Sequence, residues 1–228
     1  MMRLPVVFAA FISVLLLPAW GPFGSDEDAL KPYHGADAGR IVLSLGAYKG
    51  ADFIRYSILF RPRGQTQTGR ITYDIKWPTN FNDQYERGQV WTYALKPGDY
   101  EIYNFELEFA TSGGALVSLW NEPKVPTGWT MTDQMGVISL QQPLSIPFTV
   151  HAGETIYLGE FLAMQTAATN GLGMPVPAGA KFQLSNQSER DLPVAKLRDD
   201  AITTMKSELP DPDKIGSPVL EWLPGASH

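Results

Sequence analysis

The chain has 228 residues, of which 44% are hydrophobic and 18% charged, and its formal net charge at pH 7 is −6. This composition excludes an intrinsically disordered chain, and the absence of cysteine excludes a disulfide scaffold. The acidic balance argues against nucleic acid as a partner, because no basic field is available to displace phosphate counterions. We therefore expect a globular protein that is stabilised by its core alone.

Residues 1–21 have the composition of a secretory signal peptide. Arg3 supplies a positive charge, the run from Leu4 to Leu17 has no charged residue, and Pro18 follows it. An apolar core of this length is typical of a cleaved export signal. An uncleaved membrane anchor is the alternative, because the segment is close to spanning length. We expect an exported protein of the periplasm or cell envelope, whose membrane contact is limited to this segment if it is retained.

Residues 22–39 form an acidic leader that we expect to be flexible. In the domain that follows, residues 40–209, apolar and polar residues alternate in short runs, most clearly at 70–77. Alternation with a period of 2 is typical of half-buried antiparallel strands. Strands are predicted at 40–45, 54–61, 70–77, 90–95, 103–109, 116–120, 144–150, 155–161 and 180–186. Eight or nine short strands separated by turns predict a mainly β fold, an antiparallel β-sandwich, with a closed barrel as the alternative.

The periodicity changes to helical after Ser188. Asp191 can cap a helix and Pro193 is tolerated in a first turn. Apolar residues then recur at helical spacing, at Val194, Leu197, Ala201 and Met205. We expect one C-terminal amphipathic α-helix of about four turns that packs this stripe on the sandwich. Residues 210–228 begin with two prolines and are predicted to be a mostly irregular tail.

Two stretches carry a family resemblance: Leu95–Ile102, with the sequence LKPGDYEI, and Phe148–Gly159, with the sequence FTVHAGETIYLG. Both resemble uncharacterised exported bacterial β-sandwich domains of transthyretin-like or carboxypeptidase-regulatory-like type, over roughly residues 40–205. The resemblance implies the fold and export. Such proteins are often lipoproteins, whereas this chain has no cysteine for lipid attachment. The resemblance supplies no catalytic residues.

No sequence motif points to a metal or a cofactor. The three histidines, His34, His151 and His228, share no short motif, and a zinc site needs three or four ligands. The stretch from Asp211 to Gly216 lacks the oxygen ligands of a calcium loop. The chain also has no G-x-S-x-G elbow for a serine nucleophile.

Two acids on one strand face, Glu106 and Glu108, offer the main catalytic alternative. Paired carboxylates serve glycosidases, but there they flank the sugar rather than lie side by side on one strand. We expect them to pair with Arg70 or Lys76 of a neighbouring strand. A carboxylate hydrolase would instead require Glu106 or Glu154 to meet a second acid from another strand in a concave site.

The aromatic residues are the better candidates for a functional surface. Phe81, Tyr85 and Trp129 fall outside clear strands, and Trp222 lies in the tail. Exposed aromatics can anchor a protein partner or stack on a sugar, although aromatics can also close the open ends of a core. We expect a non-catalytic exported interaction module that binds an envelope protein. A carbohydrate- or peptidoglycan-binding module is the first alternative, and a carboxylate hydrolase the second.

Overall fold

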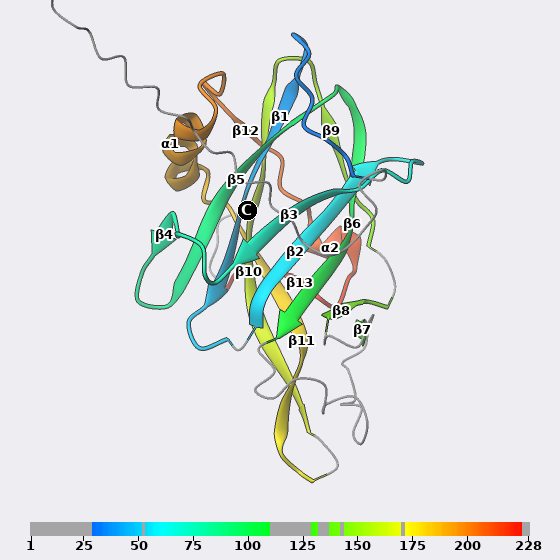
Figure 1. Cartoon of the computed structure of the whole chain (residues 1–228), viewed down its shortest axis with the longest axis vertical. Helices are drawn as coiled ribbons and strands as arrows, with labels where there is room; N and C mark the ends of the chain where they lie inside the picture. Colours follow the sequence, from blue (N-terminus) through cyan, green and yellow to red (C-terminus); the bar gives the residue numbers. More distant parts are fainter. Residues whose placement is uncertain are drawn as a thin grey trace, which may run out of the picture.

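The computed structural model describes residues 29–51, 53–109, 129–131, 137–141, 144–169 and 172–224. In this part the chain forms a mainly β structure with two sheets and two helices (Figure 1), which confirms the predicted fold class at that level. The predicted signal peptide at residues 1–21 and the predicted strand at 116–120 lie outside the described residues.

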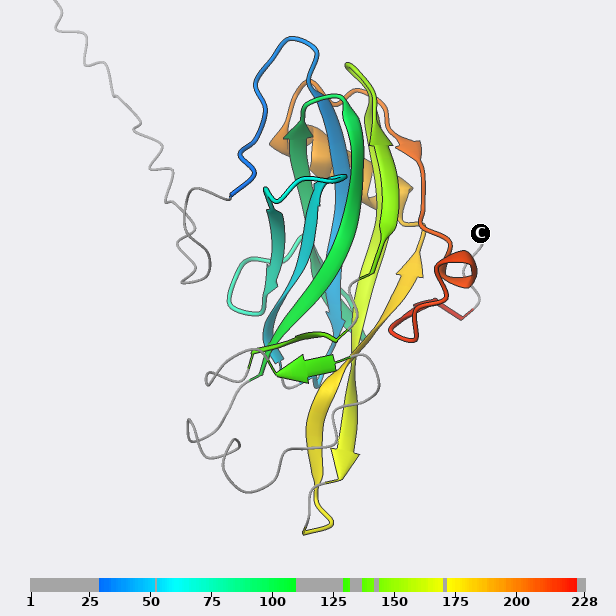
Figure 2. The same cartoon turned by 90° about the vertical axis from the view of Figure 1, so that its right-hand side faces the viewer.

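The first sheet has seven strands, and the second has six. The first has the order β13 (Leu220–Trp222), β11 (Pro175–Ser185), β10 (Thr155–Thr169), β1 (Gly39–Tyr48), β5 (Glu86–Leu95) and β4 (Phe81–Asn82), with β12 (Lys206–Ser207) also paired to β10. The second has the order β3 (Gly69–Asp74), β2 (Phe53–Pro62), β6 (Gly98–Phe109), β8 (Val137–Leu140) and β7 (Trp129–Met131), with β9 (Ile146–Val150) also paired to β6. Figure 2 shows the two sheets as facing layers.

The longer predicted strands are found, but the prediction of purely antiparallel sheets is wrong. β1, β2, β3, β5, β6, β9, β10 and β11 each contain or overlap a predicted strand. β1 pairs in parallel with β10, and Ala47 lies opposite Ala163 at the end of this pairing. Alternation reports which face of a strand is buried, not the direction of its neighbour. The described residues form thirteen strands rather than eight or nine, because strands of two to four residues show no readable alternation.

An aromatic contact joins the two sheets across the core. Phe105 of β6 stacks on Phe182 of β11 with ring centroids 4.1 Å apart, and Tyr56 of β2 lies 5.3 Å from the same Phe182 ring. The Tyr56 hydroxyl lies 2.9 and 2.7 Å from the carbonyl oxygens of Gly46 on β1 and Phe161 on β10 and shares its one proton between them. The buried hydroxyl is therefore satisfied, and the same residue connects the sheets by packing and by hydrogen bonding.

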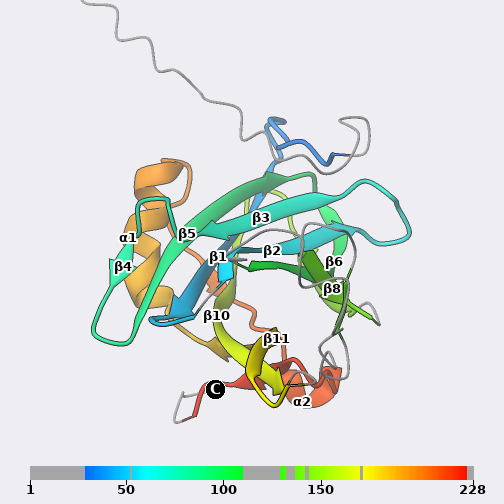
Figure 3. The ribbon, with the colours of Figure 1, turned by 60° about the horizontal axis from the view of Figure 1, so that its bottom comes forward.

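Helix α1 (Ser188–Arg198) packs beside β5 and β1 on the outer face of the first sheet (Figure 3). The predicted amphipathic helix is shorter than four turns, and only part of its expected apolar stripe packs on the domain. The helix ends before Asp199, whose backbone is extended, and Leu197 is 89% exposed. Asp191 and Ala195 are the buried residues of α1. The helix therefore docks through these two residues together with Leu192 and Val194, which pack partly buried on the sheet. A search for an apolar stripe does not find the carboxylate.

The described part of the predicted leader is attached to the domain. The Leu30 amide donates to the Thr68 carbonyl and the Tyr33 amide to the Ala94 carbonyl, both at 2.9 Å. Leu30 also packs against the core. These contacts fix residues 29–39 along the edge of the domain, although the sequence predicts a flexible segment there.

The C-terminal tail also returns to the domain. Asp211 caps the short helix α2 (Pro212–Ile215) by accepting a hydrogen bond from the Asp213 amide. β13 then pairs in parallel with β11, with Leu220 opposite Phe182. The tail thus contains ordered structure that its composition did not indicate. Neither described helix is long and apolar enough to cross a membrane.

The aromatic contact across the core predicts a large loss of stability on truncation. Phe182 is fully buried between the sheets, so Phe182→Ala is expected to lower the free energy of unfolding by about 3–5 kcal/mol. Leu197→Ala is the control on α1, and a change within about 0.5 kcal/mol is expected because Leu197 lies in solvent. Urea unfolding measures both. If Leu197→Ala lowered the free energy of unfolding by several kcal/mol, Leu197 would be packed on the domain, as the sequence predicts.

Candidate interaction site

Residues 75–85, called the edge segment below, join β3 to β5 and fold back along the edge of the first sheet. The Asn80 amide donates to the Gly88 carbonyl at 2.8 Å, and the Asn80 Oδ1 accepts from the Val90 amide at 2.8 Å. Within the segment, β4 pairs antiparallel with β5. A connection with its backbone bonded to a sheet in this way is pre-organised, so its side chains are presented in one arrangement.

The Phe81 side chain packs on two glycines of the first sheet, Gly46 and Gly88. The Phe81 ring tip reaches the backbone of β1 and β5 at Gly46 and Gly88, where a Cβ atom would lie 3.1 and 2.0 Å from it. Any larger residue at Gly88 would push the ring away. On the helix side, the guanidinium carbon of Arg190 lies 3.7 Å from the centroid of the ring. Phe81 is therefore held from two elements, and it is partly buried rather than freely displayed.

Arg190, at the start of α1, is the centre of a polar cluster beneath the helix. Its Nε donates to Asp191 Oδ1 at 2.7 Å, and its Nη2 donates to Glu160 Oε1 at 2.9 Å and to Ser44 Oγ at 3.2 Å. Glu86 of β5 lies 3.7 Å from Nη1. One arginine thus connects α1 to β1, β5 and β10, and through its stacking on Phe81 to the edge segment.

The carboxylates of the cluster are satisfied by protein donors. Asp191 Oδ2 accepts from Ser44 Oγ and from the Tyr157 hydroxyl, both at 2.6 Å. Glu160 Oε2 accepts from Ser185 Oγ at 2.9 Å. Asp191 and Glu160 are both fully buried, and a buried charge is tolerated only when it is paired and hydrogen-bonded in this way.

The electrostatics of the cluster follow from burial and from the central arginine. Burial raises the pKa of Glu160, and the charge of Arg190 opposes this rise. For Arg190, burial acts against the charged form, but the hydrogen bond to Asp191 and the charge of Glu160 outweigh it and raise the pKa. Burial, with the nearby charges of Glu160 and Asp83, raises the pKa of Glu86 to about 7. Glu86 is thus poised to titrate near neutral pH.

The polar cluster holds elements of the fold together. Asp191 and Glu160 are bound by donors on both oxygens, so neither is poised as a base beside a nucleophile. Arg198 also connects α1 to the edge segment. Its Nη2 donates to Asn80 Oδ1 at 3.1 Å, and its guanidinium lies 5.2 Å from the centroid of the Trp91 ring. Two arginines of α1 therefore hold the edge segment.

The edge segment displays two aromatic side chains to solvent. Tyr85 is 67% exposed and Trp77 is 38% exposed, and Trp77 lies 5.9 Å from the Trp91 ring, centroid to centroid. Trp77, Trp91 and Arg198 contact one another, whereas Tyr85 lies at the other end of the edge segment, beside Lys49. We refer to these four residues together as the aromatic surface. Of the predicted site residues, Phe81 and Tyr85 belong to the edge segment that carries it.

The other two predicted aromatics lie elsewhere. Trp129, expected on an exposed loop, is on β7 and only 3% exposed, because it packs against Phe182 and over Gly179. Trp222 is on β13 and partly buried against the core. The structure thus brings together two of the four predicted residues. Trp77 was missed because its alternation placed it on a strand, and Arg190 and Arg198 were missed as ordinary helix charges.

The acids proposed for catalysis are engaged by arginines. Glu106 pairs with Arg70 of β3 and Glu108 with Arg55 of β2, which confirms the expected cross-strand pairing for Glu106. Glu154 is exposed in the turn before β10. Within the described part of the chain, no group of three or more His, Asp or Glu residues could hold a metal ion.

Comparisons with known proteins add no relative to this picture. The chain matches no family model, no curated protein and no solved structure.

Breaking the buried cluster should destabilise the fold. Asp191→Ala leaves Arg190 without its helix partner and two hydroxyls without an acceptor, so we expect a loss of about 3–5 kcal/mol in the free energy of unfolding. The control is Lys181→Ala, which removes an exposed pair with Glu221 and should cost about 0–1 kcal/mol. Equal effects of the two substitutions in urea unfolding would show that the cluster does not hold α1.

The raised pKa of Glu86 predicts a pH dependence. Between its ordinary value of 4.5 and about 7, the unfolded chain loses the Glu86 proton while the native state keeps it. The native state binds more protons in this window, so the stability contributed by Glu86 falls as the pH rises. Glu86→Gln removes the titration. The free energy of unfolding of this variant, relative to the wild type, should increase from about pH 5 to pH 7, and a constant difference would contradict the shift.

Proposed function

We propose that this protein is a non-catalytic, exported interaction module that binds a protein of the bacterial cell envelope through the aromatic surface. The observation that carries the proposal is the pre-organised display of Tyr85 and Trp77 on the edge segment, which Arg190 and Arg198 hold against the sheet. A surface fixed before binding loses little conformational entropy when a partner arrives.

The residue types of this surface fit protein recognition. Tryptophan, tyrosine and arginine dominate the energetic hot spots of protein interfaces, and the edge segment and α1 carry one of each in Trp77, Tyr85 and Arg198. The same aromatic rings could stack on a sugar, so a glycan or peptidoglycan ligand is the second candidate. We favour a protein because an arginine accompanies the rings.

The hydrolase alternative finds no support among the described residues. Its requirement was a second acid from another strand facing Glu106 or Glu154. Glu106 faces Arg70 instead, and Glu154 is exposed in a turn. Export rests on the composition of residues 1–21. A β-sandwich architecture fits the facing sheets and the aromatic contact between them.

The test is the effect of the aromatic surface on partner binding. A tagged full-length chain is used to isolate envelope partners, which are identified by mass spectrometry, purified and titrated against variants. Tyr85→Ala and Trp77→Ala are expected to weaken the affinity roughly 30-fold or more, the size of a hot-spot residue. The melting temperature of Tyr85→Ala should not change, because its side chain is mostly in solvent.

Leu197→Ala is the matched control, because Leu197 is an exposed apolar residue outside this surface. Its affinity for the partner should equal that of the wild type. If Tyr85→Ala and Trp77→Ala bind the partner as well as the control does, the aromatic surface is not the interface. Retention on peptidoglycan that is lost in Tyr85→Ala, with no protein partner, would favour the glycan alternative.

A further inference from the structure

A two-stranded arm projects from the end of the domain at which β1 ends. β1 pairs with β10 only as far as Ala163, and β13 pairs with β11 only from Phe182 onward. Beyond these points β10 and β11 pair with each other, from Gln165 opposite Ala180 to Thr169 opposite Pro175. We call residues 165–169 and 172–180 the arm, which extends beyond the sheets at the bottom of Figures 1 and 2.

The base of the arm is braced by the core. Gly179 has a positive φ of 141°, and a Cβ atom there would lie 2.7 Å from the Trp129 ring. Trp129 in turn packs on Phe182 with ring centroids 6.3 Å apart. The arm is therefore a directed extension of the sheet. From Gln165 to Thr169, the strand rise of about 3.3 Å per residue carries the far end about 13 Å past the base.

Leu172 and Met174, at the far end of the arm, are exposed apolar side chains. Leu172 is 75% exposed and Met174 is 52% exposed, and they are two of the few large hydrophobic residues in solvent. The sequence from Gln165 to Ala180 contains no charged residue, in a chain with a net charge of −6. Exposed apolar residues at the end of an uncharged projection indicate a surface that becomes buried in an apolar environment when it binds.

The backbone of the arm is suited in part to such an environment. An N–H group without a partner is costly outside water. On β11, which has no further strand beside it here among the described residues, Pro175 and Pro177 have no N–H to leave unpaired. Elsewhere in the ribbon, alternate backbone groups bond across the β10–β11 pair and the others point outward. The outward-facing groups keep their partners only where water reaches them, so insertion is limited to the headgroup region of a bilayer.

We propose that the arm inserts Leu172 and Met174 into the surface of a lipid bilayer. Insertion to the depth typical of interfacial segments, about 5–10 Å, needs only the far end of the arm. A protein groove is a poorer fit, because the arm has no tyrosine, tryptophan or arginine to act as a hot spot. Those residue types are on the aromatic surface, so this contact is independent of the proposed function.

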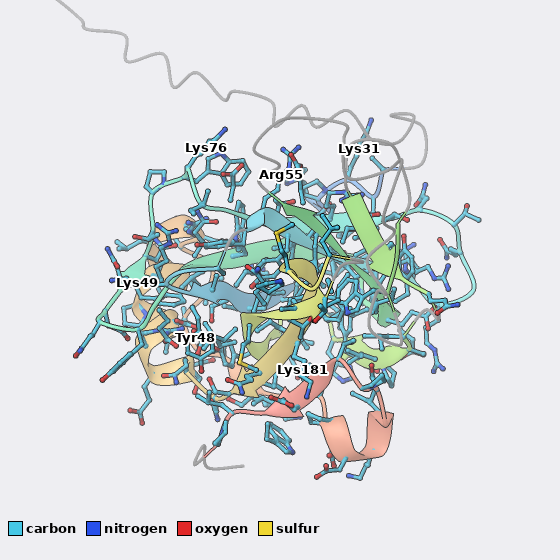
Figure 4. The ribbon with its side chains drawn as sticks, turned by 90° about the horizontal axis from the view of Figure 1, so that it is seen from below. Lys31, Tyr48, Lys49, Arg55, Lys76 and Lys181 are labelled. Carbon is cyan, nitrogen blue, oxygen red and sulfur yellow. The ribbon has the colours of Figure 1, made fainter. Side chains whose placement is uncertain are left out.

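The charge of the molecule determines which lipids the arm should prefer. Figure 4 views the molecule from this end, where Lys181 lies at the base of the arm. Lys181 pairs with Glu221 at 3.2 Å and so adds no net charge. Because the arm is uncharged and the chain acidic, its insertion should not need anionic lipid and should be insensitive to salt.

The absence of cysteine allows a direct test on the full chain. A cysteine introduced by Leu172→Cys is labelled with the polarity-sensitive dye NBD and mixed with phosphatidylcholine vesicles. We expect a blue shift and a several-fold rise in emission, with quenching by doxyl-labelled lipid. The matched control is Leu197→Cys with the same label on α1, which should stay in water even if residues 1–21 anchor the chain. Adding Met174→Asp to the labelled chain should weaken the partition about tenfold or more.

Three results would overturn the proposal. An unchanged spectrum at position 172 with phosphatidylcholine vesicles would show that the arm stays in water. A shift that needs no vesicles but grows with protein concentration would assign the arm to contact with a second copy. A shift that requires phosphatidylglycerol and disappears in salt would indicate electrostatic adsorption. None of these outcomes affects binding through Tyr85, so the two proposals fail separately.

Discussion

The attachment of α1 and of the edge segment to the first sheet depends on the buried contact of Arg190 with Asp191 and Glu160. This contact adds to the apolar packing that usually docks a surface helix, since α1 buries a carboxylate beside Ala195, Leu192 and Val194 and leaves Leu197 in solvent. The charges can remain in the interior because hydroxyls from β1, β10 and β11 complete their hydrogen bonds. The same arginine stacks on Phe81 and so fixes the edge segment.

This constraint divides the aromatic residues by role. The aromatic contact between the sheets uses Phe105 and Phe182, and Trp129 extends it to the base of the arm. Phe81 holds the edge segment in place, because its ring packs between Gly46 and Gly88 on one side and Arg190 on the other. Tyr85 and Trp77 are left to meet solvent, on a segment whose position is already set. The proposed partner surface is thus a consequence of how α1 is attached.

Sequence patterns predicted the mainly β fold because alternation is a local property of each strand. They did not predict the parallel pairing of β1 with β10, which depends on residues more than a hundred positions apart. The site was found in part: Phe81 and Tyr85 stood out as aromatics outside strands, whereas Trp129 was misplaced because a three-residue strand has no period. The role of Arg190 was hidden, since only the fold brings Glu160 and Ser44 beside it. Gly46 and Gly88 gave a weak signal, as glycines inside strands often mark close approach.

The most direct test of this account measures whether Arg190 fixes the edge segment. Hydrogen–deuterium exchange is compared between the wild type and Arg190→Lys. The lysine keeps the positive charge but lacks the planar guanidinium, which hydrogen-bonds Asp191 and Glu160 and stacks on the Phe81 ring. If Arg190 fixes the edge segment, Arg190→Lys exchanges faster at the amides of Asn80 and Val90 and along α1, with exchange at core residues such as Phe105 unchanged. Unchanged exchange at Asn80 and Val90 would contradict it, because the edge segment would then keep its position without the arginine.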